Sequence, residues 1–406
     1  MPRTSRRAPS RGALRAIGLA TVGLGGAAIG LAAHFARQVL TPANGPEERV
    51  QLWALEASGS SPTGQRVWIH GPDAALDGEY SFIWGGGAGH ARLGAVIDEI
   101  DDSGTLRVAR EVLSVERGTL RAGITGRVTG WWYTDPEQLG YGSEVVRIPA
   151  DGGSIWAWLI RPEPGTEQPG RWAIHIHGRG ALPEEALRGV APLARAGIPS
   201  LVLAYRNDPG TPAGIGGRYG LGLAEHRDID DAIAWTMSQG ADRITLVGWS
   251  MGGTAAVLSA TRGPFSAIID GLVLDSPGLD WPTLLERQAE IARLPRPLGR
   301  LGMGLMQRGW VRGAVPGAEG TDLHALTAEA LAADLHAPVL LHISPEDTFV
   351  PWDGALDFAL EQPELVIVHE MRGEHVKLWN TDPRAWEAAT ECFVRALDDP
   401  HLASRD

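Results

Sequence analysis

The chain has 406 residues, of which 44% are hydrophobic and 21% are charged. This length and composition exclude wholesale disorder and allow two or three domains with a substantial core. A single cysteine excludes an intrachain disulfide framework and a multi-cysteine metal site, and the net charge of -13 argues against non-specific nucleic-acid binding. Arginine supplies all but one of the 36 cations, which we interpret as the codon bias of a GC-rich bacterial genome.

The amino-terminal region differs from the rest of the chain in charge. Six arginines and no acidic residue precede Pro46, whereas the remainder carries 30 cations against 49 acids. Within this region Ala16–Ala33 is uncharged, and 18 helical residues span about 27 Å of a ~30 Å hydrocarbon layer. We therefore expect residues 1–40 to form a basic start and a single transmembrane helix, with the amino terminus cytoplasmic and the remainder extracytoplasmic. A cleaved signal peptide followed by secretion is the alternative.

Residues 41–142 are expected to form a small β-rich accessory domain. After a linker at Thr41–Glu48, short β-like runs alternate with turn signals such as Asp102–Gly104. The glycine-rich stretch Trp84–His90 lacks the Gly-Lys-Ser/Thr ending and the following helix of a phosphate loop. We expect a structural or substrate-gating role for this domain. The runs are Val50–Leu55, Arg66–Ile69, Tyr80–Trp84, Gly94–Ile97, Leu106–Val108 and Val128–Tyr133.

Residues 143–406 alternate apolar runs with amphipathic segments. The first two runs suggest a hairpin around Asp151–Gly153, and the later alternation predicts a mostly parallel eight-stranded sheet with helices on both faces. The expected strands are Val145–Ile148, Ile155–Ile160, Trp172–His177, Ser200–Tyr205, Ile244–Trp249, Ile268–Leu274, Val339–Ile343 and Val366–His369. The expected helices are Glu184–Ala196, Ala224–Ser238, Met251–Thr261, Gly354–Glu361 and Pro383–Leu397.

A Gly-x-Ser-x-Gly motif, residues 248–253 (GWSMGG), falls at one strand–helix junction. The motif alone has little weight in a chain with 53 glycines, but a strand before it and a helix after it are what a nucleophile elbow requires. Gly248 and Gly252 lack the Cβ atoms that would collide in so tight a turn. The pattern therefore predicts Ser250 as a nucleophile with an exposed Oγ.

A serine hydroxyl needs a general base and an orienting acid before it can attack a carbonyl. His375 follows the last expected strand, and Asp347 follows the strand before it. Both lie at carboxyl ends of strands, where open α/β sheets place their sites. Glu346 and Asp275 compete with Asp347 for the role of the acid, and Asp275 is better placed to cap or line the pocket.

Two backbone N–H groups are expected to stabilise the oxyanion. Met251 follows the nucleophile at the start of a helix and supplies the first. The loop His177–Gly180, with its two glycines, follows an expected strand and supplies the second, which we assign to Arg179. His175 and His177 share one strand face, but no third ligand is spaced to complete a metal site.

These motifs together resemble the α/β-hydrolase superfamily, and GWSMGG is most similar to its esterase- and lipase-like serine hydrolases, with prolyl-oligopeptidase-like enzymes as neighbours. The resemblance covers about Ser143 to Leu397. It implies an α/β-hydrolase fold, the chain order Ser250, Asp347, His375 for nucleophile, acid and base, and an acyl-enzyme that needs no metal or organic cofactor. Peptidases of that neighbourhood typically have Tyr after the nucleophile and a large propeller, whereas this chain has Met251 and a short accessory domain.

An insertion at residues 278–325 contains two amphipathic, methionine-bearing segments. We expect a helical pair that covers the nucleophile as a cap; an element lying on a lipid surface is the alternative. Both interpretations favour a hydrophobic acyl substrate.

The sequence therefore predicts a membrane-tethered, extracytoplasmic serine hydrolase that cleaves a small-molecule or lipid-like ester, thioester or amide. It predicts no nucleic-acid partner. A prolyl-oligopeptidase-like peptidase, an acyltransferase and a non-catalytic binding protein with a hydrolase fold are the alternatives.

Overall fold

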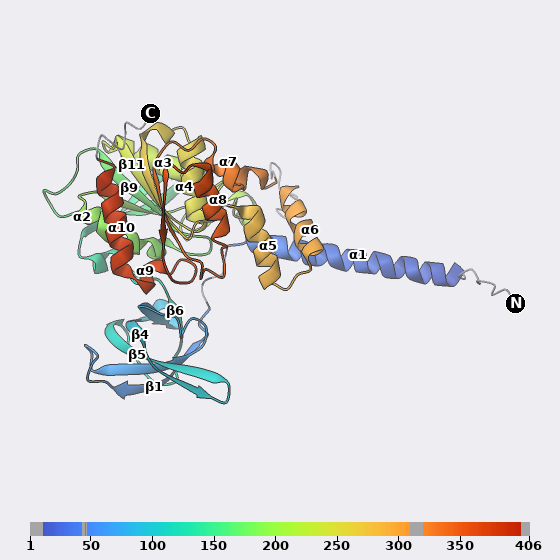
Figure 1. The fold of residues 1–406 in the computed structure, drawn as a ribbon, viewed down its shortest axis with the longest axis horizontal. Helices are drawn as coiled ribbons and strands as arrows, with labels where there is room; N and C mark the ends of the chain where they lie inside the picture. Colours follow the sequence, from blue (N-terminus) through green and yellow to red (C-terminus); the bar gives the residue numbers. More distant parts are fainter. Residues whose placement is uncertain (1–10, 43–44, 46, 309–319, 399–406) are drawn as a thin grey trace.

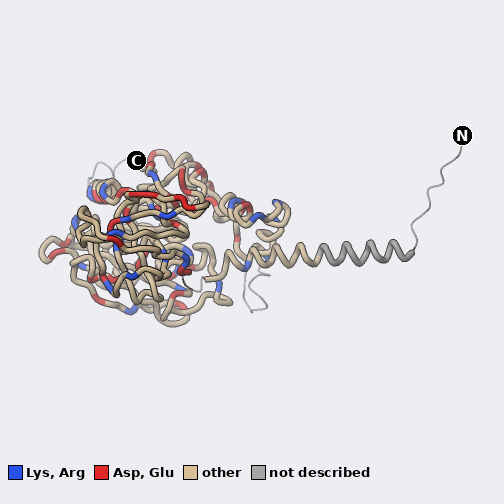
Figure 2. The backbone as a smooth tube through the Cα atoms, turned by 90° about the horizontal axis from the view of Figure 1, so that it is seen from below, with Lys and Arg blue, Asp and Glu red and all other residues tan. Residues whose placement is uncertain are grey.

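The computed structural model describes residues 11–42, 45, 47–308 and 320–398. A long amino-terminal helix leads into a β-barrel, and the barrel leads into a larger α/β unit (Figure 1). Acidic and basic residues are interspersed over both units (Figure 2). The sequence of α1 (Arg11–Leu40) contains no acidic residue.

The carboxyl-terminal turns of α1 pack on protein. Phe35, Ala36 and Leu40 are buried in the core of the α/β unit. No helix in the described part of the chain is both long and apolar enough to cross a bilayer. The predicted transmembrane helix Ala16–Ala33 is therefore not supported; the side chains of residues 16–25 lie outside the described part.

The predicted all-β domain is a closed antiparallel barrel with the strand order β1-β2-β5-β4-β3-β6. Alternating apolar side chains such as Leu52, Phe82 and Val112 fill its interior. The runs expected at Gly94–Ile97 and Leu106–Val108 belong to one long hairpin that turns at Ser103-Gly104. The strands are β1 (Val50–Ala57), β2 (Gln65–His70), β3 (Tyr80–Trp84), β4 (Gly89–Asp102), β5 (Thr105–Arg117) and β6 (Thr125–Thr129).

The predicted eight-stranded sheet is also present, in the order β14-β13-β12-β11-β9-β10-β8-β7. The β7–β8 hairpin and the β8–β10 pair are antiparallel, and the remaining pairs are parallel. The strands are β7 (Gly142–Ala150), β8 (Gly153–Arg161), β9 (Arg171–Ile176), β10 (Ser200–Ala204), β11 (Arg243–Trp249), β12 (Ile269–Asp275), β13 (Val339–Ile343) and β14 (Val366–Glu370).

Helices cover both faces of this sheet, so that the central strands are apolar on both sides. On β11, Leu246 faces one core cluster and Val247 faces the other. One face carries α2 (Val190–Arg195), α9 (Leu378–Thr381) and α10 (Pro383–Ala396). The other carries α3 (His226–Ser238), α4 (Met251–Arg262), α7 (Ala328–Ala332) and α8 (Asp353–Glu361).

The insertion forms α5 (Trp281–Ile291) and α6 (Arg296–Gln307). These helices lie on the side of the α/β unit where α1 enters, and α6 packs directly against α1 (Figure 1). Gly302 allows the close approach, because a Cβ there would lie 3.0 Å from the Ala32 carbonyl oxygen and 3.1 Å from the Phe35 ring. The apolar face of α6 is thus occupied by α1.

The barrel is fastened to the α/β unit at α9. The fully buried Asn380 amide donates to the carbonyl oxygens of Glu79 (2.8 Å) and Gly130 (3.2 Å), and its oxygen accepts from Arg188 at 2.5 Å. The Glu79 N–H donates in turn to the Asn380 carbonyl at 2.9 Å. A Cβ on Gly78 would lie 2.3 Å from that carbonyl oxygen. The two units therefore meet backbone to backbone, five residues beyond His375.

Candidate active site

Ser250 occupies the turn between β11 and α4 with φ 51° and ψ -117°. Such a conformation costs about 1–3 kcal/mol and persists only where its surroundings enforce it. Here a Cβ on Gly252 would lie 2.3 Å from the Ile176 carbonyl oxygen, and a Cβ on Gly248 would lie 2.8 Å from Gly252. Two glycines thus let the chain turn directly on β9, which gives the elbow expected from the sequence.

The structure brings Ser250, His375 and Asp347 together. His375 Nε2 lies 2.9 Å from Ser250 Oγ, and His375 Nδ1 lies 2.7 Å from Asp347 Oδ2. The other carboxylate oxygen of Asp347 accepts the N–H groups of Phe349 and Val350 at 2.9 and 2.8 Å. The Asp347 side chain is only 4% exposed. The carboxylate is therefore held in one orientation by backbone donors while it faces the imidazole.

The two competing acids bind other groups. Glu346 accepts Arg372 Nε at 2.8 Å and the Gly373 N–H at 3.1 Å. Asp275 is buried behind the site and accepts Trp386 Nε1 at 2.8 Å and Ser276 Oγ at 2.9 Å.

Asp275 nevertheless supports the histidine loop. Ser276 Oγ, which donates to Asp275, also accepts the Val376 N–H at 3.1 Å, next to His375. Ser276 and Val376 both have positive φ, at 47° and 51°. Burial raises the pKa of Asp275 to about 6. Asp275 is not among the walls of the cavity at Ser250; through Ser276 it supports the backbone next to His375.

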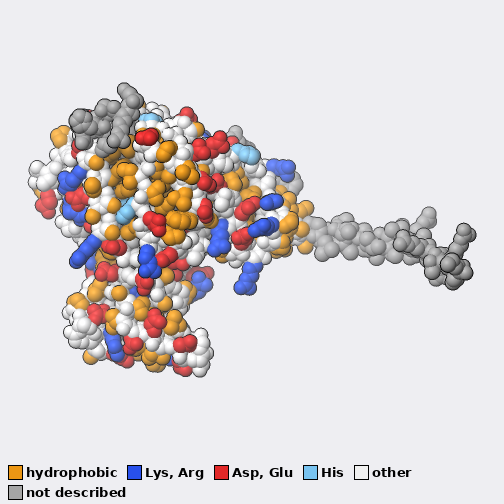
Figure 3. All heavy atoms as spheres, in the orientation of Figure 1, with side chains coloured by type: hydrophobic (Ala, Val, Ile, Leu, Met, Phe, Trp, Pro, Cys, Tyr) orange, Lys and Arg blue, Asp and Glu red, His pale blue; other side chains and the backbone are white. Residues whose placement is uncertain are grey.

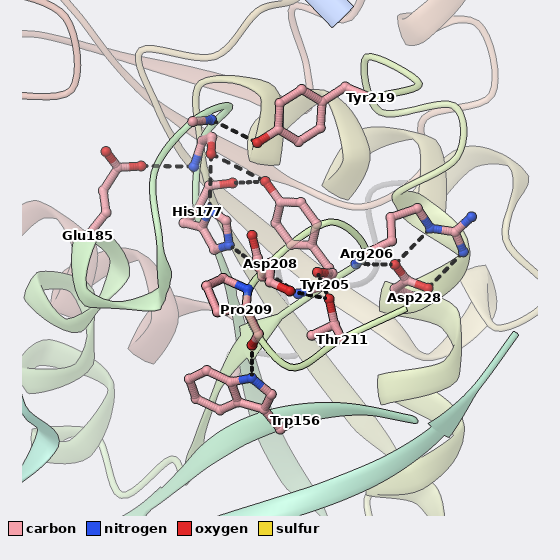
Figure 4. Close-up of polar contacts among 12 residues, drawn as sticks. Trp156, His177, Glu185, Tyr205, Arg206, Asp208, Pro209, Thr211, Tyr219 and Asp228 are labelled. Atoms are coloured by element: carbon pink, nitrogen blue, oxygen red, sulfur yellow. Dashed lines mark hydrogen bonds and ion pairs between the residues drawn. The ribbon is translucent and has the colours of Figure 1, made fainter. Parts of the chain in front are cut away.

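The loop after β9 is fixed by side chains on both sides of Arg179. The Gly178 N–H donates to Glu185 Oε2 at 2.8 Å, and the Gly180 N–H donates to the Tyr219 hydroxyl at 3.2 Å (Figure 4). A Cβ on Gly178 would lie 3.1 Å from Ser250 Cβ, so this loop runs beside the nucleophile. Met251 is the first residue of α4, and a helix leaves its first N–H groups without intrahelical partners.

His177 secures the base of the same loop. Its Nε2 lies 2.8 Å from Asp208 Oδ2, its ring stacks on Tyr205 at 4.2 Å, and the Tyr205 hydroxyl donates to the His177 carbonyl (Figure 4). Burial disfavours its charged form, but the Asp208 carboxylate outweighs burial and raises the pKa of His177. His175 is bonded to Ser200 Oγ at 2.9 Å. Within the described residues, no group of three or more His, Cys, Asp or Glu side chains could hold a metal ion.

A cavity of about 440 Å³ opens at Ser250 and His375. Phe349 and Val376 line it from the α/β unit, and Asp73 and Leu76 line it from the barrel. No described residue of α5 or α6 is among its walls, and the cap expected from residues 278–325 stays a prediction. In the described residues α6 packs on α1, and the barrel contributes Asp73 and Leu76 to the walls of the cavity.

Sequence reasoning missed the barrel residues because their approach depends on long-range packing. It also missed Glu185 and Tyr219, which hold the loop after β9. The turn residues around Gly78 were a local signal of a loop, but nothing in them indicates what that loop touches.

Comparison with known proteins agrees with this fold. Residues 173–400 match a model described as the alpha/beta hydrolase family, and residues 57–129 match a domain of unknown function (DUF8805). The first match covers more than half of the chain, and the chain belongs to the alpha/beta hydrolase family. No curated protein matches it.

Solved structures of esterases are similar to this chain at low identity. The esterase Pf2001 of Pyrococcus furiosus is 20% identical with a TM-score of 0.49, over 65% of this chain and 96% of that one. Est1E of Butyrivibrio proteoclasticus is 17% identical with a TM-score of 0.46, over 62% and 98%. An esterase of Pyrobaculum calidifontis is 17% identical with a TM-score of 0.45, over 66% and 88%.

We predict that Gly252→Ala disrupts the site. Its Cβ would lie 2.3 Å from a backbone oxygen of β9, so the elbow must shift. A misplacement of about 1 Å costs on the order of 10²-fold in rate, to be measured as the rate of Ser250 acylation by a fluorophosphonate. Gly304→Ala is the control, because a Cβ there meets nothing within 4 Å. Equal acylation rates in the two variants would refute the packing argument.

We predict that Asp275→Asn flattens the pH dependence of stability. The folded pKa, about 6, lies above the ordinary 3.8, so the folded state binds more protons between these values. Stability from this group is present below about pH 4 and is lost as pH rises through about 6. Urea unfolding from pH 4 to 7 measures this, and an unchanged slope in the variant would contradict it.

Proposed function

We propose that the protein is a serine hydrolase that cleaves carboxylic esters through an acyl-enzyme. Ser250 attacks the carbonyl carbon, and His375 accepts the Oγ proton and then donates it to the leaving alcohol. Asp347 orients the imidazole and stabilises its cation. Water, deprotonated by His375, then hydrolyses the acyl-enzyme and regenerates Ser250. The observation that carries this proposal is the hydrogen-bond chain from Ser250 Oγ through His375 to Asp347.

We propose that two backbone amides receive the negative charge of the tetrahedral intermediate. The Met251 N–H lies at the start of α4, where the helix dipole favours an anion. The Arg179 N–H lies in the loop beside Ser250, between two amides that already bind Glu185 and Tyr219. One such donor is worth about 10²–10³ in rate. The charge stabilisation by these amides acts on the carbonyl oxygen, which every acyl substrate has.

The cavity supports an ester with an apolar group beside the carbonyl, because Leu76, Phe349 and Val376 contribute to its walls. Transfer of the acyl group to an alcohol or amine uses the same acyl-enzyme, and added acceptors would reveal it in the products. Thioester and amide cleavage need the same residues. The extracytoplasmic location stays a prediction that rests on the charge difference on the two sides of Pro46.

Ser250→Ala is predicted to abolish both fluorophosphonate labelling and turnover of short p-nitrophenyl esters, since no other group can form the acyl-enzyme. Intact-mass measurement and initial rates check this. Ser238→Ala, at an exposed serine in α3 (His226–Ser238), should keep the wild-type values. A wild-type protein inert toward every serine-directed probe would instead favour the non-catalytic binding protein.

Asp347→Asn is predicted to lower kcat by about 10⁴-fold, because the amide favours the wrong imidazole tautomer. Glu346→Gln tests the competing acid; it removes a surface ion pair with Arg372 and should have a far smaller effect. Steady-state kinetics with p-nitrophenyl acetate separates the two. A larger loss in the Glu346 variant would reassign the acid.

A further inference from the structure

The segment between β2 (Gln65–His70) and β3 (Tyr80–Trp84), residues 71–78, brings the barrel into the active site; we call it the barrel loop. Its Asp73 and Leu76 share one cavity with Ser250 and His375. Two smaller cavities, of about 200 and 250 Å³, flank the loop, one beside Pro72 and the other beside Asp77. The loop therefore lines the same cavity as Ser250 and borders a smaller cavity on each side.

The barrel fixes the backbone of this loop from within. Arg110 on β5 (Thr105–Arg117) is fully buried, and its guanidinium donates to the carbonyl oxygens of Ala74 (2.9 Å), Gly78 (2.9 Å) and Leu76. It also donates to the Gly94 carbonyl on β4 (Gly89–Asp102) at 2.8 Å. One side chain thus ties three points of the loop to the barrel wall.

An ion pair joins the middle of the loop to the segment that carries the catalytic histidine. Lys377 Nζ lies 2.8 Å from Asp73 Oδ2, and Lys377 is two residues beyond His375. Lys377 is the only lysine of the chain and is 18% exposed, whereas Asp73 is 40% exposed. Asp73 has a positive φ of 63°. Charged side chains of both signs gather where the barrel meets the α/β unit (Figure 3).

We propose that the barrel loop is the substrate-selecting wall of the active site and that the Asp73–Lys377 ion pair is its latch. With the latch closed, Leu76 limits the cavity, so that the enzyme accepts esters of compact acyl groups and rejects long chains. This inference rests on the proposed function. It assigns the barrel a role in specificity and replaces the lipid-like substrate expected from the sequence with a compact ester.

Leu76→Ala tests the wall. Shortening this side chain widens the cavity, and we expect kcat/KM for p-nitrophenyl decanoate, relative to the acetate, to rise about tenfold over wild type. Leu76→Trp should lower the same ratio. If one of the two variants fails to fold, the other still tests the wall. The rates at which a short and a long-chain fluorophosphonate acylate Ser250 should change in the same sense.

The outcomes separate the two proposals. A wild-type protein that neither probe acylates overturns the proposed function. Acylation with an unchanged long-to-short ratio in both Leu76 variants leaves the proposed function intact and overturns the wall. A wild-type protein that prefers the decanoate overturns the assignment of compact esters.

Lys377 gives a test of the latch that needs no turnover. Its amine must leave Asp73 before it can be acetylated by an N-hydroxysuccinimide ester, and no other lysine competes. Peptide mapping should show faster acetylation in Asp73→Asn than in wild type. Glu56→Gln, which removes a barrel ion pair of similar exposure with Arg66, should match wild type. Equal acetylation of Lys377 in all three proteins overturns the latch.

Discussion

The contact between the β11–α4 turn and the neighbouring strand β9 determines the geometry of the whole site. Gly252 approaches the carbonyl oxygens of Ile176 and His177 so closely that no side chain fits between them. This approach holds Ser250 in its positive-φ conformation and brings the loop after β9 alongside the serine. The same contact therefore sets both the conformation of Ser250 and its position beside the loop that carries Arg179.

Both the α/β unit and the barrel hold the segment that carries His375. Within the α/β unit, the buried Asp275 and Ser276 support the backbone of Val376. The barrel contacts the same segment of chain at Asn380. The segment with His375 is thus held by hydrogen bonds at Val376, the next residue, and at Asn380, five residues later. The accessory domain is consequently part of the framework that keeps the imidazole within hydrogen-bond distance of Ser250.

Sequence patterns predicted the α/β unit well because each of its signals is local. Strand β13 coincides with its predicted bounds, and Ser250, Asp347 and His375 were recognisable from the strand ends that they follow. Alternating runs also predicted the all-β domain, but not its closure into a barrel. Sequence patterns could not predict what each helix packs against. An amphipathic segment such as α6 has a recognisable apolar face, but its sequence does not show whether α1, lipid or the active site covers that face.

The sequence also could not predict that the barrel loop approaches the site. This approach depends on contacts between residues about 300 positions apart, such as Asp73 and Lys377. Glu185 and Tyr219, which hold the loop beside the nucleophile, lack a sequence motif altogether. The alternation of apolar runs with amphipathic segments predicted the class of fold, and the strand ends predicted the candidate triad residues. The shape of the pocket could be described only from the three-dimensional structure.

The bonds that Arg110 donates to the barrel loop go only to main-chain oxygens, which every amino acid provides. These bonds hold the path of the loop whatever side chain follows the Leu76 backbone. Replacements at position 76 can therefore accumulate without remodelling the barrel. Related chains could diverge in the esters they accept through a few point changes here, and a library restricted to this loop is a natural starting point for redesign.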